Sequence, residues 1–106
     1  MPRYYLIQLV NKPQDQLTEQ KRDELHRMKR NIYQDTIREV EQLLQEGCFQ
    51  DIKEDVDDFI LALQRRDLPA IRQGILKVPG FSMICDQTGL LDAEPTLLFL
   101  CHGTRR

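Results

Sequence analysis

The chain has 106 residues, of which 41% are hydrophobic and 30% are charged, and its formal net charge is −2. This length supports one domain with one hydrophobic core, the composition disfavours wholesale disorder, and the near-neutral charge argues against a generic binder of polyanions. No apolar run approaches the roughly 20 residues that cross a bilayer, and three widely spaced cysteines favour a reducing compartment over a disulfide framework. We therefore expect a soluble, cytoplasmic domain over residues 1–106, with residues 102–106 as a frayed tail.

The first predicted element is a strand over Tyr4–Val10. Its residues are mainly aromatic, aliphatic and β-branched, and they are apolar on both faces except at Gln8. The segment Asn11-Lys12-Pro13 ends the run. The run is too short for a secretory leader and has no small-residue cleavage site, so we interpret it as part of the fold.

A long amphipathic helix is expected over residues 17–46, which contain no proline or glycine. Asp15 or Thr18 is the candidate N-cap, and Gly47 supplies the left-handed residue that ends the helix. At 1.5 Å per residue such a helix is roughly 45 Å long, so it runs the length of the domain or overhangs it. Its apolar stripe is Leu25, Met28, Ile32, Tyr33, Ile37, Val40, Leu43 and Leu44.

A second helix is expected over residues 51–66, with Asp51 and Glu54 as a variant of the capping box. The four-residue link 47–50 favours an antiparallel hairpin with the long helix. The stripe of the second helix is Ile52, Val56, Phe59, Ile60 and Leu63.

A short third helix is expected from Asp67, its N-cap, to about Lys77, with Pro69 tolerated in the first turn. Its inward residues are Leu68, Ile71, Ile75 and Leu76, and Pro79-Gly80 ends it.

The C-terminal third predicts strands. Phe81–Cys85 is a short strand, Asp86–Gly89 is a turn, and Leu90–Leu91 adds an extended piece. Thr96–Cys101 is apolar at consecutive positions, so we expect a central strand covered on both faces. The order β-α-α-α-β-β predicts an α+β domain, in which a sheet of about three strands is covered by the helical hairpin and the third helix. The predicted core is Tyr5, Ile7, Leu9, Ile32, Val40, Leu44, Val56, Phe59, Ile60, Leu63, Ile71, Ile75, Phe99 and Cys101.

Candidate metal or thiol chemistry rests on Cys101-His102, the only adjacent pair of soft ligands. His26, Cys48 and Cys85 could converge on the pair, but structural zinc sites usually present their ligands in several closely spaced pairs. Adjacent residues of a strand point to opposite faces, so His102 is badly placed to activate the thiol. We therefore interpret the cysteines as buried thiols and His102 as a surface residue.

The acidic run from Asp51 to Asp58 is a second candidate. Asp51, Asp55 and Asp58 share one helix face, which allows a weak cation site, but the run lacks the ligand pattern and central glycine of an EF-hand. A solvated face is the simpler interpretation. The sequence predicts no catalytic residue, no metal ligand and no cofactor.

The distribution of charge is more informative than any motif. Residues 21–30 carry a surplus of +3, and residues 39–58 carry a surplus of −7. An antiparallel hairpin gathers the acidic residues at its turn and brings Arg65 and Arg66 toward the basic half of the long helix. This separation of positive and negative charge has two alternative explanations. It serves solubility, or it steers the association of a protein partner.

The leading hypothesis is a non-enzymatic interaction or regulatory protein, acting as a homodimer or an accessory subunit through protein contacts. Leu25 and Met28 are expected to line a two-fold interface, because the second helix is too short to cover them. The first alternative is a nucleic-acid-associated regulator that uses the basic residues of the long helix with Arg65 and Arg66; the second is a thiol- or metal-dependent enzyme around Cys101 and His102. The predicted partner-binding residues are Leu25, Met28, Lys21, Arg22, Arg27, Lys29, Arg30, Asp55 and Asp58.

Overall fold

The structure is a computed structural model, and it describes residues 3–97. Within these residues every regular element is a helix, so the predicted α+β fold with a three-stranded sheet is wrong. The chain instead forms a small helical bundle. Its elements are α1 (Arg3–Asn11), η1 (Gln14–Gln16), α2 (Glu19–Gln45), η2 (Gln50–Ile52), α3 (Lys53–Arg65), α4 (Leu68–Lys77), α5 (Pro79–Thr88) and α6 (Leu90–Ala93).

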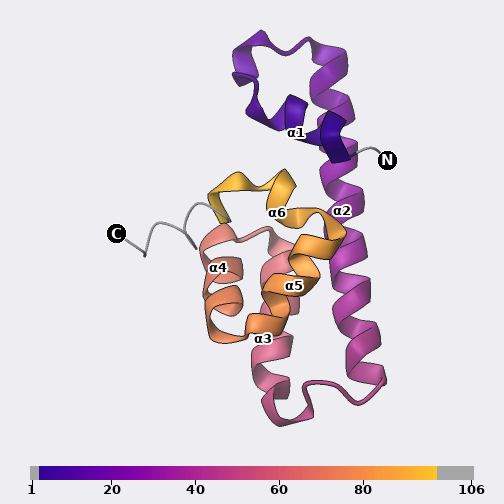
Figure 1. The fold of residues 1–106 in the computed structure, drawn as a ribbon, viewed down its shortest axis with the longest axis vertical. Helices are drawn as coiled ribbons and strands as arrows, with labels where there is room; N and C mark the ends of the chain where they lie inside the picture. The colour runs from indigo at the N-terminus through magenta and orange to yellow at the C-terminus, as the bar shows by residue number, and fades with distance from the viewer. Residues whose placement is uncertain (1–2, 98–106) are drawn as a thin grey trace.

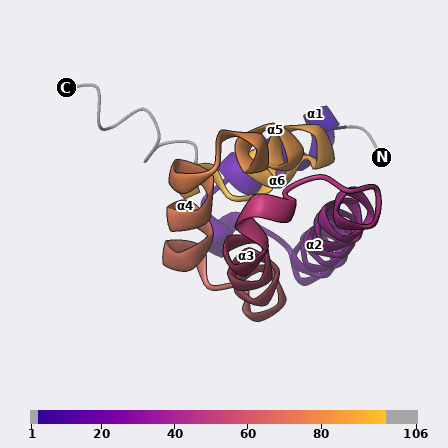
Figure 2. The same cartoon turned by 90° about the horizontal axis from the view of Figure 1, so that it is seen from below.

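The long helix α2 runs along most of the molecule, whose principal extents are 45 × 34 × 22 Å (Figure 1). The chain turns after α2 and α3 returns beside it, so the predicted antiparallel hairpin is confirmed. Helix α3 lies between α2 and α4, and α5 lies on the other side of the bundle from α3 (Figure 2). Helices α1 and α6 pack together against the N-terminal half of α2.

The N-terminal segment is a helix because its buried residues need a helical period. Leu6 and Leu9 are both buried, at 1% and 4% exposure, while Tyr4 points outward at 73% exposure. In a helix, residues three apart share a face; in a strand, they point to opposite sides. A short apolar run fits either element, and here the contacts with α2 and α6 select the helix.

The predicted strand Phe81–Cys85 lies inside α5. Pro79 occupies the first turn of this helix, where its missing N–H does no harm, and Gly89 follows the end with φ of 92°. Phe81, Ile84 and Cys85 are buried on one helical face. The predicted turn before Gly89 is therefore the last turn of a helix.

The remaining predicted strand residues are also helical where they are described. Leu90–Leu91 opens α6, and Thr96 and Leu97 lie in a helical turn. Residues 98–101, including the predicted core residues Phe99 and Cys101, lie outside the described residues, as does the predicted tail 102–106.

The three predicted helices are confirmed. Residues at the ends of α2 and α4 explain why the bounds of these two could be predicted. Thr18 accepts a hydrogen bond from the Lys21 N–H at 3.1 Å, and Gly47 has φ of 94° beyond the end of α2. Asp67 caps α4 by accepting from the Ala70 N–H at 3.3 Å. The predicted capping box of α3 is wrong, because the η2 turn precedes this helix and no side chain caps it.

The core is centred where α3, α4 and α5 meet. The rings of Phe59 and Phe81 stack at 4.2 Å between centroids with an interplanar angle of 9°. Gly74 lets α4 approach this stack, because an added Cβ would lie 2.5 Å from Cδ1 of Phe59. Of the predicted core, the buried residues are Leu9, Ile32, Val40, Val56, Phe59, Leu63, Ile71 and Ile75, and the partly buried ones are Tyr5, Ile7, Leu44 and Ile60.

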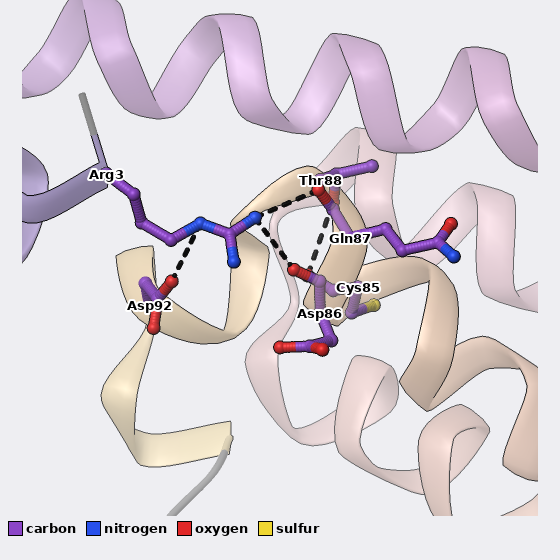
Figure 3. Close-up of polar contacts among 6 residues, drawn as sticks. All are labelled: Arg3, Cys85, Asp86, Gln87, Thr88 and Asp92. Carbon is purple, nitrogen blue, oxygen red and sulfur yellow. Dashed lines mark hydrogen bonds and ion pairs between the residues drawn. The ribbon is translucent and has the colours of Figure 1, made fainter. Parts of the chain in front are cut away.

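A polar clasp fastens the start of α1 to the C-terminal helices. Nη2 of Arg3 donates to the carbonyl oxygens of Asp86 and Gln87, each at 3.0 Å, and its Nε lies 3.1 Å from the Asp92 carboxylate (Figure 3). These carbonyls belong to the last turn of α5, and that of Asp86 also accepts from the Gly89 N–H at 3.3 Å. The Arg3 guanidinium thus adds donors at a helix end that is more than 80 residues away in the chain.

Candidate functional site

The structure corrects the predicted apolar interface on α2. Leu25 is only 5% exposed, and Met28 is partly buried against the core. Leu25 shares one core with Leu6 and Leu17, because α1 and the η1 segment fold over the half of α2 that α3 does not reach. The expectation that Leu25 stays uncovered for another chain is therefore wrong.

The predicted separation of charge is visible in the hairpin. Lys21, Arg22, Arg27 and Arg30 are exposed on the N-terminal half of α2, and Lys29 is half-buried. Residues 39–58 lie around the hairpin turn at the opposite end. The two charge surpluses therefore sit at opposite ends of one pair of packed helices.

Arg66 lies toward the basic half of α2, as the hairpin predicts. Its guanidinium lies over the ring of Tyr33, 4.8 Å from the centroid, and Arg66 shares a hollow of about 400 Å³ with Arg22 and Lys29. The hollow is not purely cationic, because Asp23 and Glu94 also line it. Its full lining is Gln14, Arg22, Asp23, Leu25, His26, Lys29, Arg66 and Glu94.

Glu94 is engaged by two residues of α2. The Tyr33 hydroxyl donates to Glu94 Oε2 at 2.7 Å, and Lys29 Nζ lies 3.6 Å from Glu94 Oε1. Burial of the phenol, and then its hydrogen bond to Glu94, raise the pKa of Tyr33 far above its usual range. This arrangement fixes the Tyr33 phenol against Glu94 and links α2 to the residue that follows α6.

A second polar cluster surrounds Tyr5. Its hydroxyl donates to Glu24 Oε1 at 2.8 Å and accepts from Lys21 Nζ at 2.6 Å. The hydrogen bond with Tyr5 raises the pKa of Lys21. The predicted partner-binding residue Lys21 is thus also used to hold α1 against α2.

The acidic residues of α3 do not converge on a cation. Asp55 pairs with Lys77 of α4 at 3.4 Å, beside a hollow of about 310 Å³ that Asp58 also lines. Among the described residues, no group of three or more histidine, cysteine or acidic side chains has the geometry to hold a metal ion. Asp51 and Asp58 are exposed, whereas Asp55 is half-buried beside Lys77.

The candidate thiol chemistry is only partly within the described chain. Cys85 is buried in α5, whereas Cys48 is exposed beside the hairpin turn, so the prediction of buried thiols is wrong for Cys48. His26 is exposed and lines the hollow that Arg22, Lys29 and Arg66 share. Cys101 and His102 lie outside the described residues.

An exposed leucine on α3 went unnoticed in the sequence. Leu61 is 42% exposed, and it lies on the side of α3 opposite the buried residues Val56, Phe59 and Leu63. Its neighbours at helical spacing are Glu54, Asp58 and Arg65, which are all exposed. We call Glu54, Asp58, Leu61 and Arg65 the α3 outer face. A helical wheel of residues 53–65 would have found it, because Leu61 falls outside the apolar stripe.

Comparison with known proteins identifies no relative. No protein-family model matches the chain, and no curated protein and no solved structure matches it significantly. Across residues 3–97, no helix combines the length and apolar character that a membrane span requires.

Proposed function

We propose that this protein is a non-enzymatic interaction protein that acts through protein–protein contacts, first of all with a second copy of itself. The observation that carries the proposal is the separation of charge on one hairpin, with +3 over residues 21–30 and −7 over residues 39–58. Complementary charge of this kind steers association and fixes orientation more than it adds affinity.

The hairpin also supports the proposal through its rigidity. Helices α2 and α3 pack against each other over a buried stripe that includes Val40, Val56 and Leu63, each at most 1% exposed. A partner therefore meets charges at fixed spacing and needs little reordering of the chain to bind. We assign the protein to the cytoplasm, because the exposed thiol of Cys48 suits a reducing compartment.

Sedimentation of the purified full chain over a wide concentration range tests self-association. We expect a monomer–dimer equilibrium at micromolar concentrations that weakens as salt rises from low to high ionic strength, because exposed charges are screened. A single monomeric species up to high micromolar concentration at low salt would contradict the proposal.

Nucleic-acid binding is the second candidate, and one observation favours it: Arg22, Lys29 and Arg66 line the same hollow. Asp23 and Glu94 line it too and would repel neighbouring phosphates, which places this candidate second. Fluorescence anisotropy with labelled single- and double-stranded oligonucleotides separates the two. Salt-dependent binding that Arg66→Gln and Lys29→Gln weaken would favour nucleic acid over self-association.

A further inference from the structure

The α3 outer face has the spacing of a helix-pairing seam. Glu54, Asp58, Leu61 and Arg65 follow one another at intervals of four, three and four residues, the alternation that places side chains along one line of a coiled coil. All four are exposed in the folded chain. Helix α3 packs on α2 and α4 (Figure 2), and the line lies opposite its buried residues, although Asp58 also borders the hollow between α3 and α4.

The order of these residues makes the line complementary to itself. Its N-terminal half is acidic, with Glu54 and Asp58, and its C-terminal end is basic, with Arg65. If a second α3 lies antiparallel so that Glu54 faces Arg65 of the other copy, the same register places Asp58 opposite Leu61. A two-fold axis then passes midway between Asp58 and Leu61, and every contact occurs twice.

This register gives each part of the line a physical role. The two Leu61 side chains lie beside the axis and remove apolar surface from water, and the two Asp58 side chains lie equally near it, where arginines have to offset their charge. Arg65 of each copy lies against Glu54 and within reach of Asp58 of the other copy, so both ends carry opposite charges. A parallel arrangement would instead set like charges against each other at both ends, which is unfavourable.

We propose that the α3 outer face is a docking site for the α3 of a second copy, packed antiparallel about a two-fold axis beside Leu61. This inference rests on the proposed self-association and specifies where it occurs. Helix α3 has 13 residues and is about 20 Å long, so its contact area is below that of standard stable interfaces. The dimer is accordingly a weak one, with the monomer–dimer equilibrium at micromolar concentrations that the proposed function expects.

Charge reversal and its compensation provide the decisive test, measured by sedimentation equilibrium on the full chain at low salt. Arg65→Glu places like charges together at both ends, and we expect a dissociation constant at least about tenfold higher. The double variant Glu54→Arg/Arg65→Glu restores opposite charges and should recover dimerisation close to the wild type. Leu61→Asp should weaken the dimer to a similar extent as Arg65→Glu, because it sets a like charge opposite Asp58 of the other copy.

Two matched controls change the same residue types elsewhere on the surface. Arg38→Glu alters an exposed arginine of α2, and Leu76→Asp alters a leucine of α4 that is 56% exposed, so its predicted inward position is wrong. Neither should change the dissociation constant more than about twofold, and circular dichroism should show that all variants remain folded. If the wild type dimerises but Arg65→Glu and Leu61→Asp leave the dimer intact, this interface is overturned and self-association still stands. The same holds if the double variant fails to restore the dimer that Arg65→Glu weakens. A wild type that never dimerises removes both.

Discussion

The end of the molecule where α3, α4 and α5 meet and the end where α1 docks are held by different interactions. The first end is apolar and closely packed, with the Phe59–Phe81 stack at 4.2 Å and Gly74 pressed against it. At the second end, polar contacts accompany Leu6 and Leu9, and they include the Arg3 clasp and the hydrogen bond from Tyr33 to Glu94. Stability at the apolar end should therefore depend on side-chain volume, and at the α1 end on charge, salt and pH.

The largest effect is expected from Phe59→Ala at the apolar end. Phe59 is 1% exposed, so its truncation should lower the free energy of unfolding by about 3–5 kcal/mol. Urea unfolding followed by circular dichroism measures this loss. Leu61→Ala on the same helix is the control, because its side chain is 42% exposed and should cost much less. Similar losses for the two variants would mean that the buried face of α3 is wrongly assigned.

Gly74→Ala sharpens the comparison because it adds a single carbon. The new Cβ would lie 2.5 Å from Cδ1 of Phe59, and overpacking of about 1–3 kcal/mol should exceed the gain of up to about 1 kcal/mol from helix propensity. In the Phe59→Ala background the clash is absent, so the same substitution should be neutral or stabilising. A double-mutant cycle by urea unfolding measures this coupling. Equal effects in both backgrounds would show that α4 does not depend on the close approach at Gly74.

At the α1 end, Tyr33→Phe removes the hydroxyl group that donates a hydrogen bond to Glu94. We expect a loss of about 1–2 kcal/mol at pH 8, the usual cost of one hydrogen bond to a charged group. Because the pKa of Tyr33 is raised in the folded protein, the unfolded tyrosine ionises first, above about pH 10. Its contribution to stability is complete below that pH and declines as pH rises further.

The stability difference between wild type and Tyr33→Phe isolates this contribution from other groups that titrate in alkali. The difference in the free energy of unfolding should shrink between pH 8 and pH 11, because only the wild type loses stability through this phenol. A difference that stays constant over this range would place Tyr33 in water rather than in its contact with Glu94.

The smallest effect is expected from Arg3→Gln. The Arg3 side chain is 47% exposed and its Asp92 pair is partly solvated, so the loss should be about 0.5–1 kcal/mol and should diminish at high salt. The Arg3→Gln substitution should accelerate hydrogen exchange, relative to the wild type, more at the amides of α1 than at those of α3 and α4. Arg38→Gln, at an exposed pair within α2, is the control and should leave exchange in α1 unchanged.

The sequence predicted α2 and α4, which begin at side-chain caps, and α3, which has a continuous apolar stripe. Helix α2 has Thr18 and Gly47, and α4 has Asp67, so their bounds were readable from local chemistry. Helices α1 and α5 are short and rich in residues that also favour strands, such as Tyr5, Ile7, Phe81 and Ile84. Whether these segments form helices or strands is decided by their packing against other helices. Those contacts come from residues far away in the sequence, so the local residue pattern does not reveal them.

The candidate partner-binding residues were likewise predicted only in part from the sequence. The two charged ends were predictable, because charge is read directly from the sequence and the short link implied the hairpin. Leu25 was misassigned because its cover comes from α1, which had been interpreted as a strand. Leu61 was missed because attention to the apolar stripe of α3 left aside an exposed leucine outside it.

The Arg3 clasp also has a consequence for the order in which the chain folds. It joins residue 3 to residues 86, 87 and 92, so it closes a loop of nearly the whole chain, and such contacts form late because loop closure costs entropy. During synthesis, the hairpin and α4 can assemble while α1 still waits for α5 and α6 to leave the ribosome. Throughout that interval only α2 can cover Leu6 and Leu9, so α1 completes its packing after the helices that follow it in the chain.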